Sequence, residues 1–186
     1  MIRACQFVQG NYIGGLIAPN DNGVCFSLSI AWLAEKKDAG YISTLKSANA
    51  IQTIYNNGND KRTIIQASAN GLGDVPPSST PNAVIGVVTT QYGNVNGINP
   101  IPLAQSNFPA AAATFTAAAQ DNVFAWMVNT AAGGRGHVVA WRRAVRLFFD
   151  ANFGVYVNAS AADIANHLNA NYLAQYNVYH VVSFAA

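Results

Sequence analysis

The chain of 186 residues carries ten basic and eight acidic side chains, so its formal charge is +2. This charge gives no electrostatic footprint for nucleic acid, and no apolar run approaches the roughly 18 residues of a membrane span. The two cysteines allow at most one disulfide, which a chain of this length does not need in order to fold. We expect a single domain over residues 1–186, with no nucleic-acid partner and no membrane span.

Helical patterns dominate the first part of the chain. The Gly- and Asn-rich loop PNDNGV comes directly before Cys25, and Cys25, Leu28 and Trp32 recur at helical spacing. A helix is therefore expected to begin at or just before Cys25. A second helix is predicted at about residues 44–57, and a shorter third helix at residues 61–69.

Strand patterns dominate from residue 83 onward. Branched and aromatic residues gather in segments 83–90, 122–130, 137–143, 145–150, 154–157 and 177–184. One helix interrupts them after Ser160, whose hydroxyl can cap the free amides, with Asp163 near the positive end of the helix dipole. This helix is expected to bury Ile164, Leu168 and Tyr172. Helices first and a sheet afterwards indicate the α+β class.

Cys25 is the first candidate for chemistry. A thiol reacts as the thiolate, and both a helix N-terminus and a neighbouring imidazolium lower the pKa of a thiol. The start of a helix offers the first of these two influences, so we expect Cys25 to titrate well below the roughly 8.5 of a free thiol. The competing interpretation is a buried cysteine that serves only as a small apolar side chain.

His137 and Asp150 supply the groups that could activate this thiol. His137 opens one expected strand and Asp150 closes the next, with the turn near residues 142–145. In an antiparallel hairpin centred there, the two residues lie roughly opposite each other and project from the same face. A register error of one residue would place them on opposite faces. The spacing predicts that His137 is the general base and that Asp150 orients its ring.

Three segments, GVCFSLSIAWL, GGRGHVVAW and LFFDANFGVY, occur in this order along the chain. They resemble the signature blocks of the YopT and AvrPphB family of papain-like cysteine proteases. SAADIANHLNANYL is also similar to the segment that follows the aspartate in this family. The resemblance implies a papain-like α+β fold, in which an N-terminal helical part packs against a C-terminal antiparallel sheet. It also implies a catalytic triad of Cys25, His137 and Asp150.

The same resemblance implies an oxyanion hole that includes a side-chain amide a few residues before the cysteine. Asn20 matches this position best, and Asn22 is the alternative. The implied protein is a cysteine protease without a cofactor, secreted by a bacterium as a virulence effector, with a specific protein of the host cytoplasm as its substrate. The chain departs from the family pattern at Ala151, where Pro is common, and at Val138 and Val139, where small residues are common.

Several polar residues receive simpler interpretations. Three histidines and two cysteines show no paired metal-ligand spacing, so no metal is expected. Asp163 and His167 lie four apart on one expected helix, which is typical of a surface ion pair. The arginines around the expected hairpin fit a solvated turn; they are Arg135, Arg142, Arg143 and Arg146.

Two other functions are compatible with the same residues. A glutamine deamidase or transglutaminase would use the same triad and pass through the same thioester, with water or an amine as the acceptor. A catalytically inactive protein-binding module could retain the fold without the chemistry. The sequence separates the deamidase or transglutaminase from a protease poorly, whereas the intact Cys25, His137 and Asp150 argue against the inactive module.

Overall fold

The computed structural model describes residues 1–11, 25–34, 100–102, 106–107, 113, 121–128, 136–176 and 178–184. Its strands are β1 (Ile2–Gln6), β2 (Pro100–Pro102), β3 (Ser106–Asn107), β4 (Asn122–Val128), β5 (Gly136–Arg142), β6 (Leu147–Asp150), β7 (Gly154–Val157) and β8 (Val178–Phe184). Its helices are α1 (Cys25–Ala34), α7 (Ala161–Tyr172) and the short 3-10 helix η1 (Gln9–Asn11). The expected helices at 44–57 and 61–69 and the expected strand at 83–90 lie outside the described residues.

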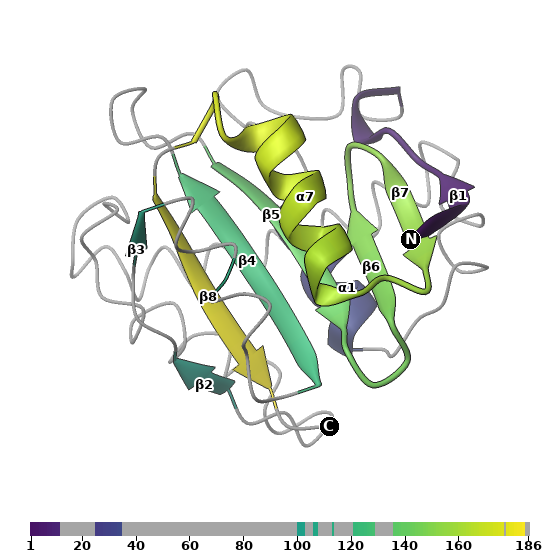
Figure 1. Ribbon diagram of the computed structural model, residues 1–186, viewed down its shortest axis with the longest axis horizontal. Coiled ribbons are helices and arrows are strands. Elements are labelled where there is room, and N and C mark those ends of the chain that lie inside the picture. Colours follow the sequence, from purple (N-terminus) through teal and green to yellow (C-terminus); the bar gives the residue numbers. More distant parts are fainter. Residues whose placement is uncertain are drawn as a thin grey trace.

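The described strands form one sheet in the order β1-β7-β6-β5-β4-β8-β2, and β3 also pairs with β8 (Figure 1). Every described pairing is antiparallel. The antiparallel sheet expected in the C-terminal part is therefore confirmed. No helix of the described segments is long and apolar enough to cross a membrane.

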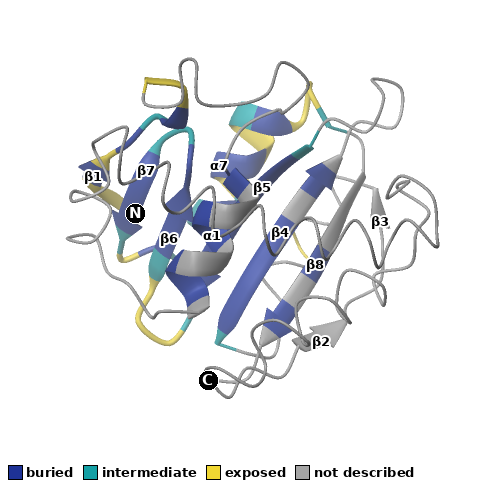
Figure 2. Cartoon of the chain, turned by 180° about the vertical axis from the view of Figure 1, so that it is seen from behind, coloured by how far each residue is buried: buried dark blue, intermediate teal, exposed yellow. Residues whose placement is uncertain are grey.

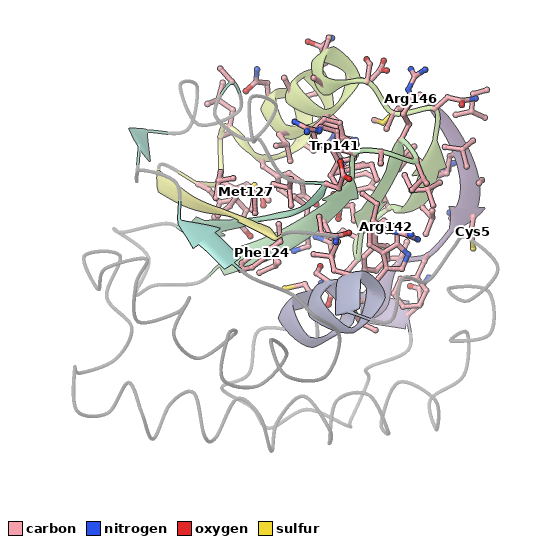
Figure 3. The ribbon with its side chains drawn as sticks, turned by 90° about the horizontal axis from the view of Figure 1, so that it is seen from below. Cys5, Phe124, Met127, Trp141, Arg142 and Arg146 are labelled. Atoms are coloured by element: carbon pink, nitrogen blue, oxygen red, sulfur yellow. The ribbon has the colours of Figure 1, made fainter. Side chains whose placement is uncertain are left out.

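The sheet lies between the two longer helices. Seen from behind, α1 lies in front of the strands, and in the view from below α1 and α7 lie on opposite sides of the sheet (Figure 2, Figure 3). Trp141 points toward α7 and its neighbour Arg142 toward α1, as alternation along a strand requires (Figure 3). On the α7 side, Trp141 joins a buried cluster with Ile164 and Leu168. On the α1 side, the ring of Trp32 packs 5.6 Å from that of Phe149.

Helix α7 forms as its sequence predicts. The amide of Asp163 donates to the hydroxyl of Ser160 at 3.2 Å, and the amide of Ser160 donates to the carboxylate of Asp163 at 3.0 Å. The hydroxyl of Ser160 also donates to the carboxylate of Asp163. The hydrogen bonds that this carboxylate accepts from the hydroxyl and the backbone amide of Ser160 lower the pKa of Asp163 to about 2. The buried side chains include Ile164, Leu168 and Tyr172, which lie four residues apart and form one stripe. The expected N-cap and the expected buried face are both confirmed.

The N-terminal strand β1 was not expected from the sequence. It pairs antiparallel with β7 at the edge of the described sheet, and most of its side chains are exposed, which weakens the alternation that would predict a strand. Gly154 lies opposite Gln6 with φ +117°, and a Cβ there would overlap the carbonyl oxygen of Cys5. A glycine at this position therefore lets β1 approach β7 closely.

Candidate active site

The structure brings Cys25, His137 and Asp150 together. Cys25 is the first residue of α1, His137 is the second residue of β5, and Asp150 is the last residue of β6. Nε2 of His137 lies 2.9 Å from Oδ1 of Asp150. The His137 ring also makes a side-chain hydrogen bond with Cys25. Because Nε2 is engaged by Asp150, Nδ1 is the nitrogen that remains for the sulfur. Asn20 and Asn22, the expected oxyanion donors, lie outside the described residues.

The pairing register of the hairpin differs from the expectation by two residues. Asp150 pairs with Val139 instead of lying opposite His137, because the turn occupies residues 143–146. A shift of two keeps His137 and Asp150 on the same face, where they become diagonal neighbours. The predicted contact therefore forms even though the predicted pairing is wrong.

The site lies at the end of the sheet where β5 begins and β6 ends. His137 shares a face with Val139, which packs in the cluster under α7, whereas Cys25 belongs to the helix on the other face. The hydroxyl of Ser29 donates to the carbonyl of Val138 at 3.2 Å and anchors α1 on β5. The thiol consequently meets the imidazole across the end of the sheet.

Burial and charge decide the protonation states of this pair. His137 is 2% exposed, and Asp150 is 0% exposed. Burial by itself lowers the pKa of His137, but attraction to Asp150 and Cys25, with hydrogen bonds to both, raises that pKa to about 10. Burial by itself raises the pKa of Asp150, but His137 and His167 hold that pKa well below its usual range. The arrangement favours an imidazolium beside a carboxylate at neutral pH.

Asp150 accepts hydrogen bonds on both carboxylate oxygens. Besides His137, Oδ1 accepts the backbone amide of Asn152 at 2.9 Å, which forms an Asx turn at the end of β6. Oδ2 lies 2.9 Å from Nε2 of His167 and 2.7 Å from the hydroxyl of Tyr172. This set of donors explains how a carboxylate remains charged without contact with solvent.

The surface ion pair expected between Asp163 and His167 does not occur. His167 is 8% exposed and bonds Asp150, whereas Asp163 caps α7 and lies 3.1 Å from the amino group of Met1. The sequence did contain a signal for this burial. His167 directly precedes Leu168 and lies three residues after Ile164, so it belongs to the buried stripe of α7.

A chain of polar groups supports the carboxylate from the N-terminal segment. Nε2 of Gln9 donates to Oδ1 of Asn152 at 2.8 Å, and Nδ2 of Asn152 donates to the hydroxyl of Tyr172 at 3.3 Å. The backbone amide of Gln9 also donates to the carbonyl of Ala151 at 2.8 Å. The turn that follows Asp150 is therefore held by η1 and α7 together.

The phenol of Tyr176 lies near the thiol of Cys25. Burial, with the charges of Cys25 and Asp150, raises the pKa of Tyr176 to about 12. Its ring centroid is 5.9 Å from that of Tyr172. Tyr176 thus remains protonated beside the site. No group of three or more histidine, cysteine or acidic side chains in the described segments is arranged to hold a metal ion.

Comparison with known proteins gives a match in structure alone. No family model matches the chain, and no curated protein matches it by sequence. Its fold is similar to the crystal structure of the Pseudomonas avirulence protein AvrPphB, with a TM-score of 0.56 and 17% identity. The match covers 88% of this chain and 93% of that chain. The chain therefore has a fold similar to that of AvrPphB, in agreement with the α+β architecture that the sequence resemblance implied.

Proposed function

We propose that this protein is a cysteine protease in which Cys25 is the nucleophile, His137 the acid and base, and Asp150 the group that orients the imidazole. One observation carries the proposal: His137 is buried between the carboxylate of Asp150, at 2.9 Å, and the sulfur of Cys25 at the start of α1. The AvrPphB-like fold and the three sequence blocks support it.

The proposed reaction is acyl transfer through a thioester. The Cys25 thiolate attacks the carbonyl carbon of a peptide bond and forms a C–S bond, while His137 gives its proton to the leaving amine as the C–N bond breaks. Water then attacks the thioester and gives a proton to His137, and the C–S bond breaks to release the acid, which restores the Cys25 thiolate and the His137 imidazolium. Asp150 stays ionised throughout. The backbone amide of Cys25 and the side chain of Asn20 are the proposed oxyanion donors.

The proposed substrate is a specific protein of a host cell. The resemblance to the YopT and AvrPphB family, together with a structural neighbour named as an avirulence protein, supports the role of a secreted bacterial effector that acts in the host cytoplasm.

Alkylation by iodoacetamide as a function of pH, followed by mass spectrometry, tests the thiol. Cys25 and Cys5 are each 7% exposed, so exposure alone gives no reason for them to react differently. We expect Cys25 to react fast near neutral pH in the wild type and to lose this advantage in His137→Ala. Equal behaviour of both cysteines in both proteins would instead support an inactive binding module.

The type of acyl transfer is tested on protein substrates from a host-cell extract, with Cys25→Ala as the blank. New N-termini that depend on Cys25 would establish a protease. Deamidated or cross-linked glutamines in intact proteins would instead establish the deamidase or transglutaminase, which shares every catalytic residue proposed here.

A further inference from the structure

Asp150 contacts two histidines, although the proposed reaction uses one. We propose that His167 and Tyr172 are positioning residues, which hold Oδ2 of Asp150 so that Oδ1 stays aimed at His137. This inference rests on the proposed function, because it concerns the same carboxylate. Both residues lie on α7, and their polar atoms come within 2.9 Å and 2.7 Å of Oδ2.

The ring of His167 is fixed by aromatic neighbours. The centroid of the His167 ring lies 5.0 Å from that of Phe153, 5.2 Å from that of Phe148 and 5.4 Å from that of Tyr156. All three contacts are edge-on. A ring packed in this way cannot follow the carboxylate if the carboxylate turns. His167 therefore defines the position of Oδ2 instead of adapting to it.

The amide of Asn171 indicates which nitrogen of His167 carries the proton. Its Nδ2 lies 3.4 Å from Nδ1 of His167 and 2.8 Å from the carbonyl of the same residue. An amide nitrogen donates only, so Nδ1 accepts and Nε2 carries the proton that binds Asp150. His167 therefore donates from Nε2 to Oδ2 of Asp150, while the imidazolium of His137 faces Oδ1.

Tyr172 contacts both members of the His137 and Asp150 pair. Because Asn152 donates to its hydroxyl at 3.3 Å, the phenolic proton is directed to Asp150. Burial and the charge of Asp150 raise the pKa of Tyr172, which keeps that proton in place. Its ring stacks on His137 with centroids 4.9 Å apart and planes at 29°. The ring of Tyr172 therefore restricts rotation of the His137 ring away from the carboxylate of Asp150.

The groups around Asp150 come from several elements. β5 supplies His137, α7 supplies His167 and Tyr172, and β7 supplies Tyr156, whose pKa is raised by burial and by Asp150. Tyr176 lies within electrostatic range of both the thiol and the carboxylate. Of these groups, His167 and Tyr172 are the ones on α7 that hydrogen-bond directly to Asp150.

The test measures the pH midpoint of Cys25 alkylation by iodoacetamide, which requires no substrate. His167→Leu removes the N–H donor to Oδ2 of Asp150. A carboxylate of Asp150 that is no longer held toward His137 stabilises the imidazolium less well. We therefore expect the midpoint of Cys25 alkylation to rise by about one pH unit toward that of a free thiol. Tyr172→Phe should shift it in the same direction. His167→Gln retains an N–H donor and should stay closer to the wild type.

Two controls separate positioning from packing. Tyr156→Phe removes a hydroxyl that interacts with Arg3, beside the same His167 ring, and should leave the midpoint in place. In an Asp150→Asn background, His167→Leu should produce no further shift, because the two changes act through one carboxylate. Nitrogen-15 NMR of the His137 ring should show its proton lost at lower pH in His167→Leu.

The outcomes distinguish the inference from the proposed function. Wild-type alkylation that does not depend on His137 would overturn the proposed function and the positioning role with it. Dependence on His137 together with unshifted midpoints in His167→Leu and Tyr172→Phe would overturn the positioning role alone. If His167→Leu fails to fold by circular dichroism, Tyr172→Phe decides the question, because it removes one hydroxyl from an otherwise intact ring.

Discussion

The two turns at the ends of β6 have opposite characters. The turn at residues 143–146 is exposed at Ala144, Val145 and Arg146, and its ion pair between Arg143 and Asp121 spans 3.9 Å. The turn at residues 151–153 begins with a fully buried Ala151 and bonds the N-terminal segment. Both turns only reverse the chain between antiparallel strands. Sensitivity to substitution should therefore follow the surroundings of each turn and not its topology.

The largest difference between the turns is expected from removing one carboxylate charge beside each. Asp150→Asn should lower kcat by about 10³–10⁴-fold, because the amide leaves the imidazolium without its partner and favours the wrong tautomer. Asp121→Asn is the matched change at the exposed turn and should alter kcat less than about twofold. Peptide hydrolysis at pH 7 measures both. Equal rates in the two variants would remove Asp150 from the mechanism.

Backbone conformation gives the next difference, because one residue with positive φ lies in the exposed turn and another, Gly154, lies directly after the buried turn. Gly154 has φ +117°, which side chains rarely adopt, and its missing Cβ makes room for Cys5. Gly154→Ala should lower the free energy of unfolding by about 3 kcal/mol or more through strain and overlap. Urea unfolding measures it. A loss below about 1 kcal/mol would mean that β1 does not pack closely on β7.

The stability of the protein at high pH tests the charge of His137, the partner of Asp150, which directly precedes the buried turn. The pKa of His137 is raised from 6.5 to about 10, so the stabilisation from its charge is complete below pH 6.5 and is lost as the pH rises through about 10. We expect the free energy of unfolding to fall by on the order of 2 kcal/mol between pH 7 and pH 10.5. Urea titrations at several pH values measure this loss. His137→Gln should lack most of it, whereas Asp121→Asn should keep it.

The smallest effect is expected at the exposed turn. Arg146 has φ 54°, in the left-handed region that Arg tolerates at modest cost. Arg146→Gly relieves this strain, but it makes the unfolded chain more flexible and removes an exposed hydrogen bond to the carbonyl of Asn158 at 3.3 Å. The free energy of unfolding should change by less than about 1 kcal/mol. Urea unfolding alongside Gly154→Ala gives the direct contrast; a larger change would show that the exposed turn is as constrained as the buried one.

Local patterns in the sequence predicted the elements that carry the site. Helical spacing placed a helix start at Cys25, and the capping residues placed α7 after Ser160. Runs of branched and aromatic residues placed the strands β4 to β8 within a few residues of their bounds. The alternation of side chains along the two strands predicted that His137 and Asp150 share a face of the sheet. This prediction holds although the expected pairing was shifted by two residues. Each of these features depends on side chains that are close in the sequence.

Features that depend on tertiary packing could not be predicted in the same way. β1 lacks a clear alternation, and Gly154 explains its place only once the two strands are paired. His167 lies four residues from Asp163, and this spacing favoured an ion pair within one helix. Its actual partner, Asp150, becomes a neighbour only when α7 packs on the sheet.

The hydrogen bond between Gln9 and Asn152 joins residues 143 positions apart. During synthesis, Gln9 leaves the ribosome long before its partner exists, and Tyr172 follows later still. Strand β8, which is made last among the described elements, lies inside the sheet between β4 and β2. Sheet pairings over such distances form slowly and late. The donors around Asp150 are therefore complete only after α7 has been translated, and a nascent chain that stops before α7 lacks the contacts that favour a charged Asp150.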